Sequence, residues 1–162
     1  MKPNPIDTST LQSKIRSSLI GGAIGDALGY QIEFDDDIRD KQVTKFKDDF
    51  GIISDDTQMT LFTSAGILLG MTRGHMRGIM GRIDTYCHWT YLDWLHTQEW
   101  DLRKPKERSD SWLMDVPELY AHRAPGNTCL SALKSLENNK DPQNNSCGCG
   151  GVMRTAPLAI LD

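Results

Sequence analysis

The sequence predicts an all-α protein that folds as a helical bundle. Its apolar residues recur mostly every four positions over 11–28 and form helical stripes over 61–69 and 76–95, which is the pattern of one buried helix face. No stretch longer than 43–46 has the character of a strand. The chain has 162 residues, which is long enough for one domain with its own core and too short for two ordinary domains.

The first helix is expected to follow a flexible arm of residues 1–8, and a hydroxyl side chain at positions 8–10 should cap its start. Three glycines lie four apart on one face of this helix: Gly21, Gly25 and Gly29. Each should destabilise the helix by about 1 kcal/mol relative to alanine. Close approach of another helix or of a ligand is the usual reason for such glycines.

The later elements follow from caps, helix breakers and apolar spacing. A second helix is expected to begin at Ser54 and end at Gly70, and a third to run from His75 to Thr97. After a charged loop, the sequence predicts a short helical piece at 111–120 and a turn at 124–128. The turn leads into a helix with Leu130, Leu133 and Leu136, which is followed by an irregular loop at 138–151. A final helical segment is expected from Thr155, with Pro157 in its first turn.

Composition narrows the classes of protein. The formal net charge of −4 argues against a broad nucleic-acid-binding surface. No apolar run is long enough to span a bilayer, and the N-terminus has no signal-peptide core. Four cysteines are too few for a disulfide scaffold, and Cys147-x-Cys149 lacks the spacing of a zinc knuckle. We therefore expect a cytoplasmic protein with free thiols and no nucleic-acid or membrane partner.

Two acidic motifs are candidates for chemistry. Asp26 lies among the glycines of the first helix, and Glu33, seven positions later, would face the same way if the helix continued. The alternative is a surface acid beside a packing strip. Ser54, Asp55 and Asp56 open the second helix, where a serine cap and acids at the positive end of the helix dipole are an ordinary structural feature. The functional alternative is a hard-cation site, because adjacent carboxylates and a hydroxyl suit Mg²⁺.

A glycine-rich segment near the C-terminus is a candidate anion site. Residues 147–154 place glycines before Arg154, so backbone N–H groups there can approach an anion closely and the arginine can add charge. The segment is not a Walker loop, because no Gly-Lys-Ser/Thr follows. A plain loop is the alternative interpretation of this segment. Residues 125–128 are a further candidate segment, for which a simple turn and helix cap is the ordinary interpretation.

Together these segments resemble the ADP-ribosylglycohydrolase family, which includes the dinitrogenase reductase-activating glycohydrolases. Five segments in family-like order and spacing carry the resemblance: 19–29 (LIGGAIGDALG) followed by Glu33, 54–61 (SDDTQMTL), 91–98 (YLDWLHTQ), 123–129 (RAPGNTC) and 148–158 (GCGGVMRTAPL).

The resemblance implies a helical hydrolase that cleaves the link between ADP-ribose and an acceptor, often a protein side chain, at a binuclear Mg²⁺ site (Mn²⁺ in some members). It implies metal ligands at Ser54, Asp55 and Asp56 and a catalytic set of Glu33, Asp55 and Asp56. The substrate contacts it implies are Asp26, Gly148, Cys149, Gly150, Gly151 and Arg154, with the glycine segment on the diphosphate.

One departure from the family pattern shapes the remaining expectations. The second metal motif of the family, of the type Asp-x-Asp-Thr, has no counterpart after residue 57. Residues 9–162 are therefore expected to be the N-terminal half of the family domain, and this chain alone to be inactive. The alternative to a hydrolase is a non-catalytic remnant, or a helical module that binds ADP-ribose or a partner.

A half domain should leave apolar positions uncovered, so self-association, a complementary C-terminal half or a loosely packed state is expected. The positions proposed for such a face are Leu61, Leu68, Leu133, Leu158 and Ile160.

Overall fold

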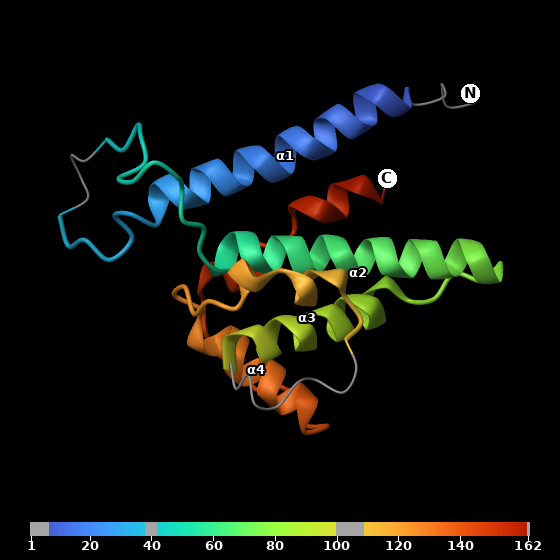
Figure 1. Ribbon diagram of the computed structural model, residues 1–162. Helices are drawn as coiled ribbons and strands as arrows, with labels where there is room; N and C mark the ends of the chain where they lie inside the picture. The colour runs from blue at the N-terminus through green and yellow to red at the C-terminus, as the bar shows by residue number, and fades with distance from the viewer. Residues whose placement is uncertain (1–6, 38–41, 100–108, 162) are drawn as a thin grey trace.

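The computed structural model describes residues 7–37, 42–99 and 109–161, in which every regular element is a helix and no strand occurs, which confirms the predicted all-α class. Figure 1 shows the arrangement of the helices. The elements are α1 (Thr8–Gly29), α2 (Asp55–Arg77), α3 (Ile83–Glu99) and α4 (Asn127–Glu137), with short 3₁₀ helices η1 (Trp112–Asp115), η2 (Pro117–Leu119), η3 (Cys149–Gly151) and η4 (Ala156–Ile160).

Helices α2 and α3 form a hairpin at the centre of the molecule. Gly78 ends α2 in the left-handed conformation, with a φ of 69°, and the chain turns back into α3. The two helices approach closely at Gly66, where an added Cβ would lie 2.7 Å from the Cα of Cys87. A hydrogen bond of 2.7 Å from Thr90 Oγ1 to the carbonyl of Phe62 joins the helices at the same level.

The hydrophobic core lies between this hairpin, α4 and the turns η1 and η2. Helix α4 packs against α3, and the ion pair of Lys134 with Glu99 (2.7 Å) lies at this interface. The buried residues of the core are Met59, Phe62, Ala65, Trp94, Leu95, Leu113, Leu119, Cys129 and Leu133. This core fixes the N-terminal half of α2 against α3, α4 and the two 3₁₀ turns.

Helix α1 lies on the other side of α2, with η4 near it (Figure 1). Ala27 is the one residue of α1 that is buried. Within the described part of the chain, nothing lies within 4 Å of a Cβ added at Gly21, Gly25 or Gly29, so no other helix approaches the glycine strip closely. The strip is left open, and two of its glycines line a cavity described below.

Several predicted boundaries are wrong. Asp7, and not a hydroxyl at 8–10, caps α1, since its carboxylate accepts the N–H of Ser9. Gly70 does not end α2: it is buried inside the helix, where an added Cβ would lie 2.6 Å from the ring of Tyr86. Because Gly78 is the true break, α3 begins eight residues later than the predicted start at His75.

Other expectations have mixed outcomes. The piece predicted at 111–120 is two 3₁₀ helices, and the final segment is also 3₁₀. Residues 43–46 form no strand, the four cysteines are free thiols, and residues 1–6 of the predicted arm lie outside the described residues. None of the helices that the structure describes is long and apolar enough to cross a membrane.

The apolar positions expected to be uncovered divide in two. Leu68 and Leu158 are exposed, as expected. Leu133 is buried in the core, and Leu61 is partly buried against it, so the expectation is wrong for these two leucines. Both lie on helix faces that turn toward the core, Leu133 on α4 and Leu61 on α2. The side chain of Ile160 lies outside the described residues.

Candidate functional site

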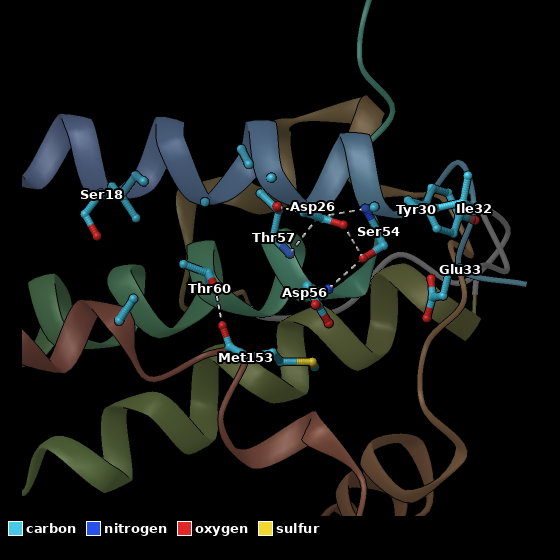
Figure 2. A pocket seen from close by; sticks show the side chains of 16 residues that line it. Ser18, Asp26, Tyr30, Ile32, Glu33, Ser54, Asp56, Thr57, Thr60 and Met153 are labelled. Atoms are coloured by element: carbon cyan, nitrogen blue, oxygen red, sulfur yellow. Dashed lines mark hydrogen bonds between the residues drawn. The ribbon is translucent and has the colours of Figure 1, made fainter. Parts of the chain in front are cut away.

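The candidate site is built around the first turn of α2, with α1 on one side and the glycine-rich segment on the other. Two cavities meet there. The first, of about 550 Å³, lies between α1 and α2 and includes Asp26 (Figure 2). The second, of about 630 Å³, lies between α2, α4 and the glycine-rich segment and includes Asp55. Glu33 and Asp56 line both cavities, so the predicted acids are brought together at this junction.

The backbone N–H groups at the start of α2 are all satisfied. The amide of Asp55 donates to the carbonyl of Arg123 at 3.0 Å, and the amide of Asp56 donates to Ser54 Oγ at 3.2 Å. The amide of Thr57 donates to Asp26 at 3.1 Å. Ser54 is the N-cap, as predicted. A helix start with every amide paired is rigid, and it holds the two acids in defined positions.

Asp26 does not present a free carboxylate to the cavity. Its two oxygens accept four hydrogen bonds of 2.5 to 3.1 Å, from the backbone N–H and the hydroxyl of Ser54 and from the same two groups of Thr57 (Figure 2). Helix α1 ends at Gly29, so the continuous helix that would have put Glu33 in line with Asp26 does not exist. The turn after α1 nevertheless brings Glu33 to the same cavity.

Asp55 is the most buried acid of the site. Its side chain accepts the N–H of Gly126 at 3.2 Å, which joins α2 to the turn before α4. Burial, together with the charges of Asp56 and Glu33, raises the pKa of this carboxyl to about 6, against the lowering effect of the Gly126 hydrogen bond.

Asp56 and Glu33 are also acids in an unfavourable setting. Burial raises the pKa of Asp56, the charge of Asp26 raises it further, and Arg154 acts in the opposite direction. Burial and the charges of Asp56 and Asp26 likewise raise the pKa of Glu33. Like charges gathered in this way repel one another, and a bound cation would relieve the repulsion.

The glycine-rich segment forms the opposite wall of the second cavity. Gly148, Cys149, Gly150 and Gly151 all line it. Arg154 also lines it, but its guanidinium is partly committed to the protein: Nε donates to the carbonyl of Gly150 at 2.5 Å, Nη2 donates to Cys129 Sγ at 2.8 Å, and the group lies 5.2 Å from the ring centre of Tyr91. The arginine therefore braces the loop as well as adding positive charge to the cavity.

Comparison with known proteins identifies the chain. The sequence model of the family described as ADP-ribosylglycohydrolase matches residues 7–162. The chain belongs to the ADP-ribosylglycohydrolase family. Searches of curated proteins and of solved structures return no match. Membership indicates glycohydrolase activity toward ADP-ribosyl groups at the level of the family, and it agrees with the resemblance drawn from the sequence.

The donor set at the start of α2 suits part of a magnesium site. Ser54, Asp55 and Asp56 offer hydroxyl and carboxylate oxygens, which are the ligands that Mg²⁺ prefers. Ser54 Oγ donates its proton to Asp26 and accepts the N–H of Asp56, so one lone pair stays available. Among the described residues, however, no group of three or more His, Cys, Asp or Glu side chains is placed to hold a metal ion. The donor groups therefore suit Mg²⁺ in their chemistry, but they are too few to complete its coordination shell.

Three residues of this site have a role that no sequence signal predicts. Tyr91 and Cys129 hold Arg154, and Gly126 binds Asp55 through its backbone. All three lie in segments that carry the family resemblance, and no spacing rule assigns them a role. Their contacts join residues 25 or more positions apart, so only the folded chain reveals them.

Proposed function

We propose that this chain forms the acidic and diphosphate-binding parts of a Mg²⁺-dependent hydrolase site that removes ADP-ribose from an acceptor such as a modified protein side chain. The observation that carries the proposal is the second cavity, whose lining combines Asp55, Asp56 and Glu33 with the segment from Gly148 to Gly151. One wall suits a cation and the ribose hydroxyls, and the other suits an anion. ADP-ribose carries both kinds of group.

The glycine-rich segment is proposed to bind the diphosphate. Its backbone can approach an anion closely because glycines have no side chain in the way, and N–H groups are good donors to phosphate oxygens. Arg154, braced by Gly150 and Tyr91, supplies positive charge from the side of the loop. This arrangement would orient the ribose end of the ligand toward the acids at the start of α2.

The reaction is hydrolysis at the anomeric carbon of the ribose. The bond from this carbon to the acceptor atom breaks, a bond to a water oxygen forms, and the acceptor gains a proton. Glu33 is proposed to take a proton from the water, since burial and neighbouring acids raise its pKa toward that needed for a base. Mg²⁺ held by Ser54, Asp55 and Asp56 would supply charge stabilisation for the ribose oxygens.

Calorimetry with Mg²⁺ and ADP-ribose tests the proposal directly. The wild type should bind ADP-ribose in the presence of Mg²⁺, and Asp55→Ala or Asp56→Ala should weaken binding of both by at least about tenfold. Asp115→Ala, which removes an exposed acid of η1 outside both cavities, is the matched control. Unchanged binding in both site variants would overturn the assignment of the acids.

Release of ADP-ribose from a modified protein is the second measurement. If the wild-type chain releases ADP-ribose and the two site variants do not, the result supports a hydrolase. Binding of ADP-ribose without turnover would instead make this chain a binding module, and the proposal of hydrolysis would then fail for the chain by itself.

A further inference from the structure

The carboxylate of Asp26 contacts a single short segment of the chain. All four of its hydrogen bonds come from Ser54 and Thr57, which lie 28 and 31 positions away at the start of α2. Two of the donors are backbone N–H groups of the first turn, which lack partners inside the helix. Asp26 therefore acts as a second N-cap for α2, supplied by a different helix.

The same contacts attach α1 to the rest of the molecule. Ala27 is the one buried residue of α1, and the glycine face of the helix meets no packing partner among the described residues. The four bonds of Asp26 are thus a main link between α1 and α2, as Figure 2 shows. The position of α1 and the geometry of the first turn of α2 are coupled through this one side chain.

Asp26 also determines how the hydroxyl of Ser54 is used. Ser54 Oγ donates its single proton to Asp26 Oδ1 at 2.6 Å, and it accepts the N–H of Asp56 at 3.2 Å. A hydroxyl has one proton and two lone pairs, so the remaining lone pair is free to face a cation or another donor. Without Asp26 the proton would be free to rotate into the position of that lone pair.

We propose that Asp26 is a positioning residue, which clamps the first turn of α2 and orients Ser54, and is not itself a ligand of the substrate or of a metal. The predicted effect on Mg²⁺ binding rests on the proposed function. In this proposal Asp26 positions α2, where the sequence leads us to expect a contact with the substrate. A charged carboxylate suits the role because all four of its partners are donors. An asparagine would turn an amide NH₂ toward at least one of them.

Four variants separate positioning from direct binding. Asp26→Asn breaks the clamp at its acceptor, Thr57→Val removes one of its donors while keeping the carboxylate, and Thr57→Ser restores that donor. Thr90→Val is the matched control, because it also deletes a buried threonine hydroxyl with a hydrogen bond, to the carbonyl of Phe62 in the core. The affinity for Mg²⁺ is measured for each variant by calorimetry.

A positioning role predicts that Asp26→Asn and Thr57→Val both weaken Mg²⁺ binding by about tenfold or more, because partners that orient metal ligands typically affect affinity to that degree. Thr57→Ser and Thr90→Val should bind like the wild type. If Asp26 were a ligand, Thr57→Val would remove one of the three hydrogen bonds to its Oδ2 and leave Mg²⁺ affinity unchanged or tighter. That result would overturn the proposal.

Amide hydrogen exchange gives a readout that does not depend on any ligand. Both amides donate to Asp26 Oδ2, which the side-chain oxygen of an asparagine could replace, so this measurement uses Asp26→Ala. The amides of Ser54 and Thr57 should exchange at least about tenfold faster in Asp26→Ala than in the wild type, while amides in the middle of α3 keep their protection. Unchanged exchange at both amides would overturn the clamp even if the wild type binds Mg²⁺. A wild type that binds neither Mg²⁺ nor ADP-ribose, with faster exchange in the variant, would instead refute the proposed function alone.

Discussion

At the scale of the residue, Asp55 combines burial with negative charge. Its pKa of about 6 in the folded protein lies above the ordinary value of 3.8, so between these pH values the folded state binds more protons than the unfolded state. The free energy of unfolding must therefore fall as the pH rises through this window, in the absence of a cation. The acid is therefore a destabilising feature at neutral pH when no cation is bound.

Asp55→Asn should remove this dependence. The amide oxygen of asparagine can still accept the N–H of Gly126, so the geometry is kept. At pH 7.5 without Mg²⁺ the variant should be more stable than the wild type by about 1–3 kcal/mol, since one pKa unit corresponds to about 1.4 kcal/mol. At pH 4 the two proteins should be nearly equal. Urea unfolding at both pH values measures the difference, and an equal gap at the two values would contradict the assignment.

Magnesium should reverse the order of stability. If Asp55 is a ligand, Mg²⁺ in large excess over its dissociation constant should raise the melting temperature of the wild type at pH 7.5, because a ligand that binds only the folded state stabilises it. Asp55→Asn should show little change. Differential scanning fluorimetry with and without Mg²⁺ tests this, with Ca²⁺ as a second hard cation for comparison. Equal shifts in both proteins would place the cation elsewhere.

At the scale of the element, glycines of α1 and α2 differ in what surrounds them. Gly66 of α2 lies against the backbone of α3, whereas Gly21 of α1 has open space around it. Gly66→Ala should destabilise the protein by roughly 1–3 kcal/mol, because the added methyl forces α2 and α3 apart. Gly21→Ala should stabilise it by up to about 1 kcal/mol, because alanine is the better helix former. Guanidinium unfolding of both variants measures this, and effects of the same sign would show that α1 is covered.

At the scale of the whole molecule, α1 and η4 present an uncovered apolar face. Ile20 and Ile24 on α1 are 59% and 46% exposed, and Leu158 and Leu161 near η4 are exposed as well. Helix α1 lies against η4, so the two elements that carry these exposed side chains are neighbours. Exposed apolar side chains favour association, so self-association stays a prediction for these two elements.

The double variant Ile20→Asp with Ile24→Asp should shift the chain toward the monomer. Charges on this face oppose its burial against another molecule. Sedimentation velocity measures the change, and Met76→Asp is the control, because Met76 is 79% exposed on the far end of α2. A wild type that is already a monomer with a cooperative melt would contradict the prediction, as would association that both variants retain.

Much of this protein follows from its sequence because the signals are local. Apolar spacing predicts the helices, since one face of each must be buried, and Ser54 is recognisable as a cap because a cap acts on amides two or three positions away. The acids, the glycine-rich segment and the family also follow from short motifs in order. Where two local rules compete the sequence is less informative: Gly70 reads as a stop, but it is a packing contact, and only the ring of Tyr86 against it distinguishes the two.

The tertiary structure alone decided what the site residues contact. Asp26 is predicted from the sequence as a substrate contact, and the fold pairs its carboxylate with Ser54 and Thr57. Arg154 looks like a free cation, but Gly150 and Tyr91 hold it. Hydrogen-bonding capacity is a property of the residue, whereas the choice of partner depends on which distant segments packing brings within about 3 Å. The sequence therefore determined the helices, the family and the chemical groups of the site, and folding determined which of those groups are left free to act.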